Sequence, residues 1–456
     1  MMNARRGWLA LLIAVMLVTA ACGSRVDAPD GTASGGGSNA AAADSNAEPS
    51  ATQPAGDSAT APAQGDATPE NNGGATDVGV TADNIKIGIQ ADITGARPGL
   101  FKTALEGLDA YVAYVNANGG VNGRTLEVVP YDTKLNGDEV RRTAKEACDS
   151  VFALVGSMGI QDSDGAATIE ECGIPDIMAT ALTQERQEVS TSYSPLPQAP
   201  GLWSTGPGAY LKTQFPDAIA HAAMITVDQA SPKLNAAKLV DAYQQEGFEF
   251  VYQGKTNVIQ IDFTKLILDM KDKGVRYVMM IADNSQMADL LKAMNTQDFH
   301  PDVIEFMPQA YSQSFVDLGG DAVEGSYVWA NFALLGESDV NPEMALYQEW
   351  LTKTHPEATP DIFGVYAWGA GMMFVEALRN SGPEATRDGL LTSLSEDFID
   401  WDANGLMGLS SPSTHTPSRC FALMQVRDGK FVRVFPEEPG TFECELGGLR
   451  EVNPDL

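Results

Sequence analysis

The sequence predicts an α/β protein with two lobes, each built on a parallel sheet. Short runs rich in β-branched residues alternate with longer segments of helical periodicity, which is typical of strands joined by crossover helices. This alternation occurs twice, and a Pro/Ser/Thr-rich interval at 190–200 separates the two series. The chain from residue 78 onward has about 380 residues, which is too long for one ordinary core and favours two.

The first series begins with a strand at 85–90, followed by a helix at 104–116 whose apolar residues recur near i, i+3, i+4 and i+7. Gly119 and Gly120 end this helix. The rest of the series comprises strands at 126–129, 152–155 and 175–178 and helices at 138–147 and 166–171. The order predicts a parallel sheet covered by helices.

The second series predicts a lobe of similar size. It comprises strands at 222–227, 248–253, 275–281 and 303–307 and helices at 234–246, 263–273 and 286–294. A long helix at 362–380 and a hairpin around 427–430 then return the chain to each lobe in turn. We therefore expect two Rossmann-like lobes joined by a hinge, lobe 1 being 79–203 plus about 330–418 and lobe 2 being 204–329 plus about 419–456. Two such sheets leave a cleft at the carboxyl ends of their strands, where α/β proteins usually bind ligands.

The first 21 residues have the layout of a secretory signal. Arg5 and Arg6 precede an apolar run, and small residues at 19–21 lead to Cys22. The run is shorter than the roughly 20 apolar residues that span a bilayer. The layout resembles the bacterial lipoprotein signal, although Thr19 stands where that signal usually has leucine. We expect a signal peptide at 1–21 and a lipidated Cys22, and the two arginines leave open whether export is general or twin-arginine.

The next segment, 22–78, is built mainly of Ala, Gly, Ser, Thr, Pro, Asp and Asn. Such a composition cannot bury a core, so we expect a disordered tether. A flexible coil of about 55 residues has a root-mean-square reach of about 40 Å. The sequence therefore predicts a globular body on the extracytoplasmic face of the cell membrane, attached only through its lipid.

The formal net charge of −32 argues against nucleic acid and anionic lipid surfaces as partners. The four histidines are scattered, and no HExxH or CxxC pattern is present, so we expect neither a metal site nor a cofactor. The chain also lacks GxSxG, P-loop and SxxK motifs. We therefore expect a protein that is not an enzyme.

Four cysteines remain besides Cys22, and four cysteines in an oxidising compartment can pair in three ways. We expect Cys148 to pair with Cys172 and Cys420 with Cys444, because each pair lies in a plausible local unit.

Several segments resemble the leucine/isoleucine/valine-binding family of solute-binding proteins, which has the type I periplasmic binding fold. They are VTADNIKIGIQADITGARPG, VNANGGVNGRTLEVVPYDTKLN, FALVGSMG, GIPDIM and DFTKLILDMKDKGVRYVMM, and the likeness runs from about residue 80 to the C-terminus. The resemblance implies a two-lobed receptor that closes over a small ligand and presents it to a membrane ABC permease. A sensor that signals to a membrane partner is an alternative, because the same cleft would serve it.

The resemblance also implies where lobe 1 binds its ligand, namely the loop 156–163 and the segment 179–183. Backbone N–H groups and hydroxyls at a helix start form a good carboxylate receptor. The predicted lobe 1 contacts are Ser157, Gln161, Ala181 and Thr183. Simple helix capping by Asp162, Ser163 or Thr183 remains an alternative for this group.

Lobe 2 departs from the amino-acid-binding pattern. Asp283 and Asn284 stand where those relatives use an aromatic residue, and Gln309 stands in the segment where they use an acid to bind the ligand ammonium. Asp283 either replaces that acid or caps a helix, and Tyr311 is either a cleft aromatic or a packing residue. We therefore expect a small polar ligand, which is an amino acid, an amide or a small carboxylate.

Overall fold

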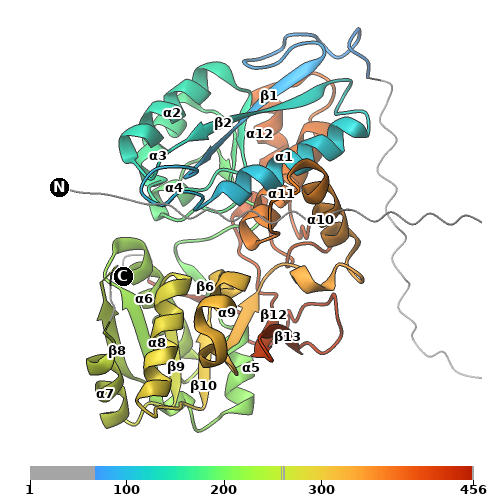
Figure 1. Ribbon diagram of the computed structural model, residues 1–456. Coiled ribbons are helices and arrows are strands. Elements are labelled where there is room, and N and C mark those ends of the chain that lie inside the picture. Colours follow the sequence, from blue (N-terminus) through green and yellow to red (C-terminus); the bar gives the residue numbers. More distant parts are fainter. Residues whose placement is uncertain (1–66, 258, 260–261, 454–456) are drawn as a thin grey trace, which may run out of the picture. The chain divides into compact units, whose positions relative to one another are not determined.

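The computed structural model describes residues 67–257, 259 and 262–453 (Figure 1). The predicted signal peptide, Cys22 and most of the predicted tether lie outside these residues. Among the residues described, no helix is long and apolar enough to cross a membrane.

The first sheet is parallel throughout, with the order β2-β1-β3-β4-β5. Its strands are β1 (Asn84–Ala91), β2 (Thr125–Asp132), β3 (Ala153–Val155), β4 (Asp176–Ile177) and β5 (Ser192–Tyr193). The helices between them are α1 (Lys102–Ala117), α2 (Gly137–Ser150), α3 (Ser163–Cys172) and α4 (Gln184–Gln187). β1 and β2 pair over eight residues, from Asn84 opposite Thr125 to Ala91 opposite Asp132, so their carboxyl ends are level.

Helices cover both faces of this sheet. Figure 1 shows α2 and α3 on one face and α1 and α11 (Ile362–Asn380) on the other. α1 and α11 approach closely because both carry a glycine at the crossing. A Cβ on Gly107 would lie 2.3 Å from the carbonyl oxygen of Gly364, so no larger residue fits there without moving the helices apart.

The second sheet has the order β13-β12-β11-β10-β9-β7-β8. Its parallel strands are β7 (Ala222–Val227), β8 (Phe250–Thr256), β9 (Tyr277–Ile281), β10 (Val303–Phe306) and β11 (Tyr327–Ala330), and its antiparallel strands are β12 (Ala422–Arg427) and β13 (Lys430–Phe435). The helices are α5 (Gly206–Gln214), α6 (Ala230–Gln245), α7 (Thr264–Asp272), α8 (Asn284–Thr296) and α9 (Gln313–Gly319).

β9 illustrates why these runs form central strands. Tyr277 and Met279 belong to the core on one face of the sheet, whereas Val278 and Met280 belong to the core on the other. All four are nearly inaccessible to solvent. Successive side chains of a strand point to opposite faces, so a continuous apolar run suits a strand buried on both sides.

After β11 the chain leaves the second sheet and returns to it only at β12. Between them lie α10 (Pro342–Thr354), α11 and α12 (Arg387–Glu396), of which α10 and α11 pack against α1 of the first lobe. Asp428 and Gly429 close the hairpin of β12 and β13 with φ of +52° and +69°, a left-handed pair that suits a two-residue hairpin turn. The predicted hairpin is confirmed.

The predicted fold class is confirmed, and both predicted disulfides, Cys148–Cys172 and Cys420–Cys444, are formed. The sequence analysis did not predict the small sheet of β6 (Leu202–Ser204) and β14 (Leu449–Glu451), the strands β5 and β11, or the helices α4, α5, α9, α10 and α12. β5 and the strands of that small sheet have only two or three residues each, which is too few for a pattern.

The packed body begins earlier than the sequence predicted, because residues 67–78, expected in the tether, contain buried groups. Asn72 is inaccessible to solvent, and its amide donates to the carbonyl of Ala82 at 2.7 Å. The guanidinium of Arg124 is also buried and donates to the carbonyls of Asn72 at 2.6 Å and Gly74 at 3.0 Å. These hydrogen bonds hold the segment against lobe 1.

Candidate functional site

Both sheets share one strand order, since β2-β1-β3-β4-β5 and β8-β7-β9-β10-β11 are equivalent. In each sheet, the chain runs from the first strand to a neighbour on one side and then crosses to the other side for the next strand. The switch point therefore lies between β1 and β3 in the first sheet and between β7 and β9 in the second. Open α/β sheets bind ligands outside the carboxyl ends of their strands at such a switch point. The residues that follow these strands are therefore the candidates.

Asp92 follows β1 directly and joins three loops at this edge of the first sheet. Its side chain is buried, with 1% exposure. The carboxylate accepts three hydrogen bonds, from the Thr133 hydroxyl at 2.5 Å, the Leu135 N–H at 2.9 Å and the Ile160 N–H at 2.9 Å. The loops after β1, β2 and β3 are thus held to one carboxylate.

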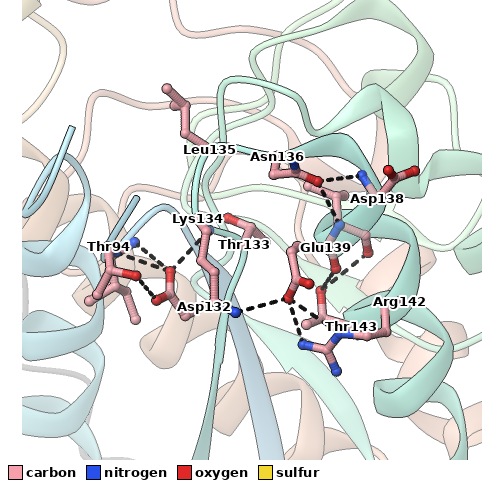
Figure 2. Close-up of polar contacts among 12 residues, drawn as sticks. Thr94, Asp132, Thr133, Lys134, Leu135, Asn136, Asp138, Glu139, Arg142 and Thr143 are labelled. Atoms are coloured by element: carbon pink, nitrogen blue, oxygen red, sulfur yellow. Dashed lines mark hydrogen bonds and ion pairs between the residues drawn. The ribbon is translucent and has the colours of Figure 1, made fainter. Parts of the chain in front are cut away.

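Asp132, at the end of β2, adds a second connection (Figure 2). Its carboxylate accepts hydrogen bonds from the backbone N–H groups of Ile93 and Thr94, from the Thr94 hydroxyl and from the Lys134 N–H. Burial alone would raise the pKa of Asp132, but the hydrogen bonds from Thr94 and the neighbouring amides lower it. Lys134 and Leu135 both have φ of +56°, a conformation that non-glycine residues rarely adopt and that these contacts maintain.

Asp162 connects the loop after β3 to the segment after β4. It stands at the start of α3, yet its side chain makes no capping hydrogen bond there. Its carboxylate instead accepts from the Leu182 N–H at 2.7 Å and from the Thr183 hydroxyl at 2.6 Å. Burial raises the pKa of Asp162 to about 6, against the effect of both hydrogen bonds and of nearby Arg186. Helix capping by Asp162 and by Thr183, two of the three residues in the alternative interpretation, is wrong, since neither side chain makes a capping bond.

The four residues predicted for lobe 1 lie at this same edge. Ser157 is buried, and its hydroxyl accepts the Gln90 N–H at 3.1 Å. Ala181 is buried, Thr183 is half-buried and Gln161 is exposed. The hydroxyls of Ser157 and Thr183 therefore already have partners within the protein.

A cavity of about 10 Å³ lies beneath these loops, which is room for one water molecule. It is lined by Gln90, Thr133, Val140, Ser157, Met158, Gly159, Asp162, Met178 and Arg186. Arg186 forms a fully buried ion pair with Asp176 at 2.8 Å, so its charge is already balanced. The cavity is too small for a solute, which leaves the outer face of the loops as the candidate surface.

In lobe 2, Asp283 and Asn284 follow β9 at the second switch point. Asp283 caps α8, because its carboxylate accepts the N–H groups of Ser285 and Gln286 at 3.0 and 3.1 Å. It also lies 3.4 Å from the guanidinium of Arg97. The Asn284 amide donates to the Ser312 hydroxyl at 2.7 Å, and its buried oxygen has no hydrogen-bond partner among the residues described.

Gln309 and Tyr311 follow β10. Gln309 is half-buried in a short 3-10 turn, Pro308–Ala310. Tyr311 is 6% exposed and packs edge-on against Phe431, with ring centroids 4.9 Å apart. Burial raises the pKa of Tyr311 to about 12. Its contacts are those of a packing residue.

One hydrogen bond joins the strand-end segments of the two sheets. The Ser231 hydroxyl, just after β7, donates to the Leu182 carbonyl, after β4, at 3.0 Å. The pair formed by Arg97 and Asp283 likewise joins a residue after β1 to one after β9. The candidate residues of the two sheets thus belong to neighbouring loops.

A larger cavity, of about 320 Å³, lies at the opposite edge of the second sheet. It is lined by Gln214, Phe215, Pro216, Asp217, Ala218, Arg276 and Asp302. These residues precede β7, β9 and β10, at the amino ends of parallel strands, where α/β sheets do not usually bind ligands. Its cation, Arg276, is paired with Asp302 at 2.6 Å. Within the residues described, no group of three or more His, Cys, Asp or Glu side chains could hold a metal ion.

Two α/β lobes of equal strand order, with fixed loops at the carboxyl ends of their strands, define a two-lobed binding protein. The family model described as periplasmic binding protein matches residues 84–430, and the chain belongs to this family. This is a family of solute-binding proteins and not a class of enzymes.

Individual proteins are similar to this chain in sequence and in structure. The Leu/Ile/Val-binding protein homolog 7 of Brucella melitensis biotype 1 is 24% identical over 385 residues, covering 80% of this chain and 94% of the relative. A fatty acid ABC transporter substrate-binding protein from Thermomonospora curvata is similar in structure, with a TM-score of 0.66, 21% identity and coverage of 80% and 98%. A branched chain amino acid ABC transporter from Thermus thermophilus with bound valine has a TM-score of 0.64, 18% identity and coverage of 77% and 95%.

Proposed function

We propose that this protein captures a small polar solute between its two lobes and delivers it to an ABC permease in the membrane. The observation that carries the proposal is the convergence of strand-end loops from two switch points, joined by the hydrogen bond from Ser231 to Leu182. A solute in that position contacts both sheets, and hinge closure removes it from water.

On the lobe 1 side, the proposed contacts are Gln161, Ala181 and Thr183, supported from beneath by Ser157. On the lobe 2 side they are Asn284 and Gln309, with Asp283 and Tyr311 holding the loops in place. The Asn284 oxygen, which has no partner in the described part of the chain, supports this assignment, because a buried acceptor without a hydrogen bond is costly and a solute N–H or O–H would satisfy it.

The fold alone does not select the solute, since structures named for a fatty acid and for a bound valine have TM-scores of 0.66 and 0.64 to this chain. Gln309 is neutral, so it does not supply the negative charge that a ligand ammonium needs. The proposed ligands are therefore small polar molecules, namely amino acids, amides and small carboxylates.

We also propose that the protein is exported and anchored through a lipid on Cys22, which supports delivery to a membrane permease. Mass spectrometry of the membrane-bound protein tests the anchor. A diacylglyceryl mass on Cys22 and its loss in Cys22→Ser are the expected results, and membrane partition of Cys22→Ser without any lipid mass would contradict the anchor.

The binding function is tested by a thermal-stability screen of the folded chain against amino acids, their amides and small monocarboxylates. A solute at 100 times its Kd stabilises the folded state by about 2.7 kcal/mol, so a true ligand gives a clear rise in Tm. A screen in which no compound raises Tm would contradict a small polar solute.

A further inference from the structure

The carboxylate of Asp162 occupies two hydrogen-bond donors at the candidate site of lobe 1. The Leu182 N–H and the Thr183 hydroxyl lie 2.7 and 2.6 Å from the two oxygens of this one carboxylate. A backbone N–H beside a hydroxyl is the donor set that binds a carboxylate in proteins. The receptor for a carboxylate is thus present, and a side chain of the chain itself fills it.

Helix capping does not account for the Asp162 side chain. A carboxylate at the start of a helix ordinarily accepts from the N–H groups of the first turn, but the Asp162 side chain accepts none of them. The side chain is 8% exposed, so its burial has to be balanced by the two hydrogen bonds that it makes to the segment after β4.

The cation that acts on this carboxylate, Arg186, is already paired with another acid. Arg186 contributes attraction to Asp162, but its guanidinium lies 2.8 Å from Asp176, and both side chains are buried. Like charges at a short distance in a buried setting repel strongly. A solute carboxylate would therefore meet both an occupied receptor and a negative charge.

We propose that Asp162 is a specificity-determining residue that fills the carboxylate receptor of lobe 1. The chemical group of the solute that lies beside Asp162 is then neutral or cationic. The inference rests on the proposed function and narrows it, because it excludes a carboxylate as the solute group that lies beside Asp162. Amides, alcohols and amines remain.

Chemical rescue tests the proposal without knowledge of the natural solute. Asp162→Ala removes the side-chain carboxylate and leaves the Leu182 and Thr183 donors unpaired, so acetate should take its place. We expect 200 mM sodium acetate to raise the Tm of Asp162→Ala by about 2 °C more than sodium chloride at equal ionic strength does. Wild type should show no such difference, and neutral acetamide should not reproduce it.

The double variant Asp162→Ala/Thr183→Val is the matched control, because it lacks one of the two donors and should lose most of the rescue. If Asp162→Ala does not fold, Asp162→Ser with formate, a smaller anion, replaces it. Equal acetate effects in wild type and variant, no rescue at all, or full rescue in the double variant would each overturn the proposal. A failed ligand screen on wild type, in contrast, would overturn the proposed function and leave the rescue unaffected.

Discussion

The strand-end loops of the two lobes are held in different ways. In lobe 1, the buried carboxylates of Asp92 and Asp162 each accept hydrogen bonds from neighbouring loops, so the loops after β1 to β4 form one network. In lobe 2, Asp283 caps its own helix and pairs with the exposed Arg97, and the oxygen of Asn284 is left without a partner among the residues described. Lobe 1 therefore presents a preformed surface, whereas lobe 2 keeps a polar group available.

The comparison predicts a large difference in stability between two aspartate substitutions. Asp92→Ala leaves one buried donor, the Thr133 hydroxyl, and two partly buried N–H groups, those of Leu135 and Ile160, without their acceptor, and should lower the free energy of unfolding by about 3 kcal/mol. Asp283→Ala removes a helix cap and should cost about 1 kcal/mol. Urea unfolding of both variants measures the difference, and equal losses would contradict the contrast between the lobes.

The two disulfides provide a comparison in which the outcomes should be equal. Cys148–Cys172 and Cys420–Cys444 each span 24 residues, so the chain-entropy account gives each about 3 kcal/mol. Replacing either pair by serines should lower the free energy of unfolding by that amount. A pair whose removal leaves stability unchanged would show that the entropic account fails for that loop.

Lobe 2 contains a buried acid that should make its stability depend on pH. Burial raises the pKa of Glu305 to about 7, although the hydroxyls of Tyr277 and Tyr243 donate to its carboxylate at 2.5 and 2.9 Å. The folded state therefore holds this proton more tightly than the unfolded state. Its contribution is complete below the ordinary pKa near 4.5 and is lost as pH rises to about 7, a change of about 3 kcal/mol.

Glu305→Gln should remove this pH dependence and leave the variant at least as stable as wild type at pH 8. Urea unfolding from pH 4.5 to 8 measures it, with Glu127→Gln, an exposed carboxylate in β2, as the matched control. The same slope in wild type and in Glu305→Gln would show that another group titrates.

Much of the fold was predictable because its signals are local. The alternation of β-branched runs and amphipathic segments gave both parallel sheets, and the Asp428–Gly429 turn gave the hairpin. The short strands β5, β6 and β14 and the early start of the packed body were not predictable, since they depend on contacts between distant residues. Arg124, for example, holds residues 72 and 74, about 50 positions away.

The candidate site was predictable only in outline. Loops 156–163 and 179–183 do lie together at the carboxyl edge of one sheet. The roles of Asp92 and Asp162 were missed, because a single aspartate after a strand carries no sign of which loop its side chain will reach. Its place before a helix makes Asp162 a candidate helix cap, but its carboxylate accepts hydrogen bonds from Leu182 and Thr183 instead.

Calorimetric titration of the solute found in the screen tests the location of the site most directly. The Thr183 hydroxyl donates its proton to Asp162, so its oxygen can accept from a solute N–H or O–H. Thr183→Val and Asn284→Ala, one in each lobe, should each weaken binding about 5- to 150-fold, which corresponds to about 1 to 3 kcal/mol for a lost buried hydrogen bond. Arg276→Ala, at the cavity on the opposite edge of the second sheet, should leave the affinity unchanged. Unchanged affinity in the first two variants together with weakened binding in Arg276→Ala would contradict a site at the strand-end loops.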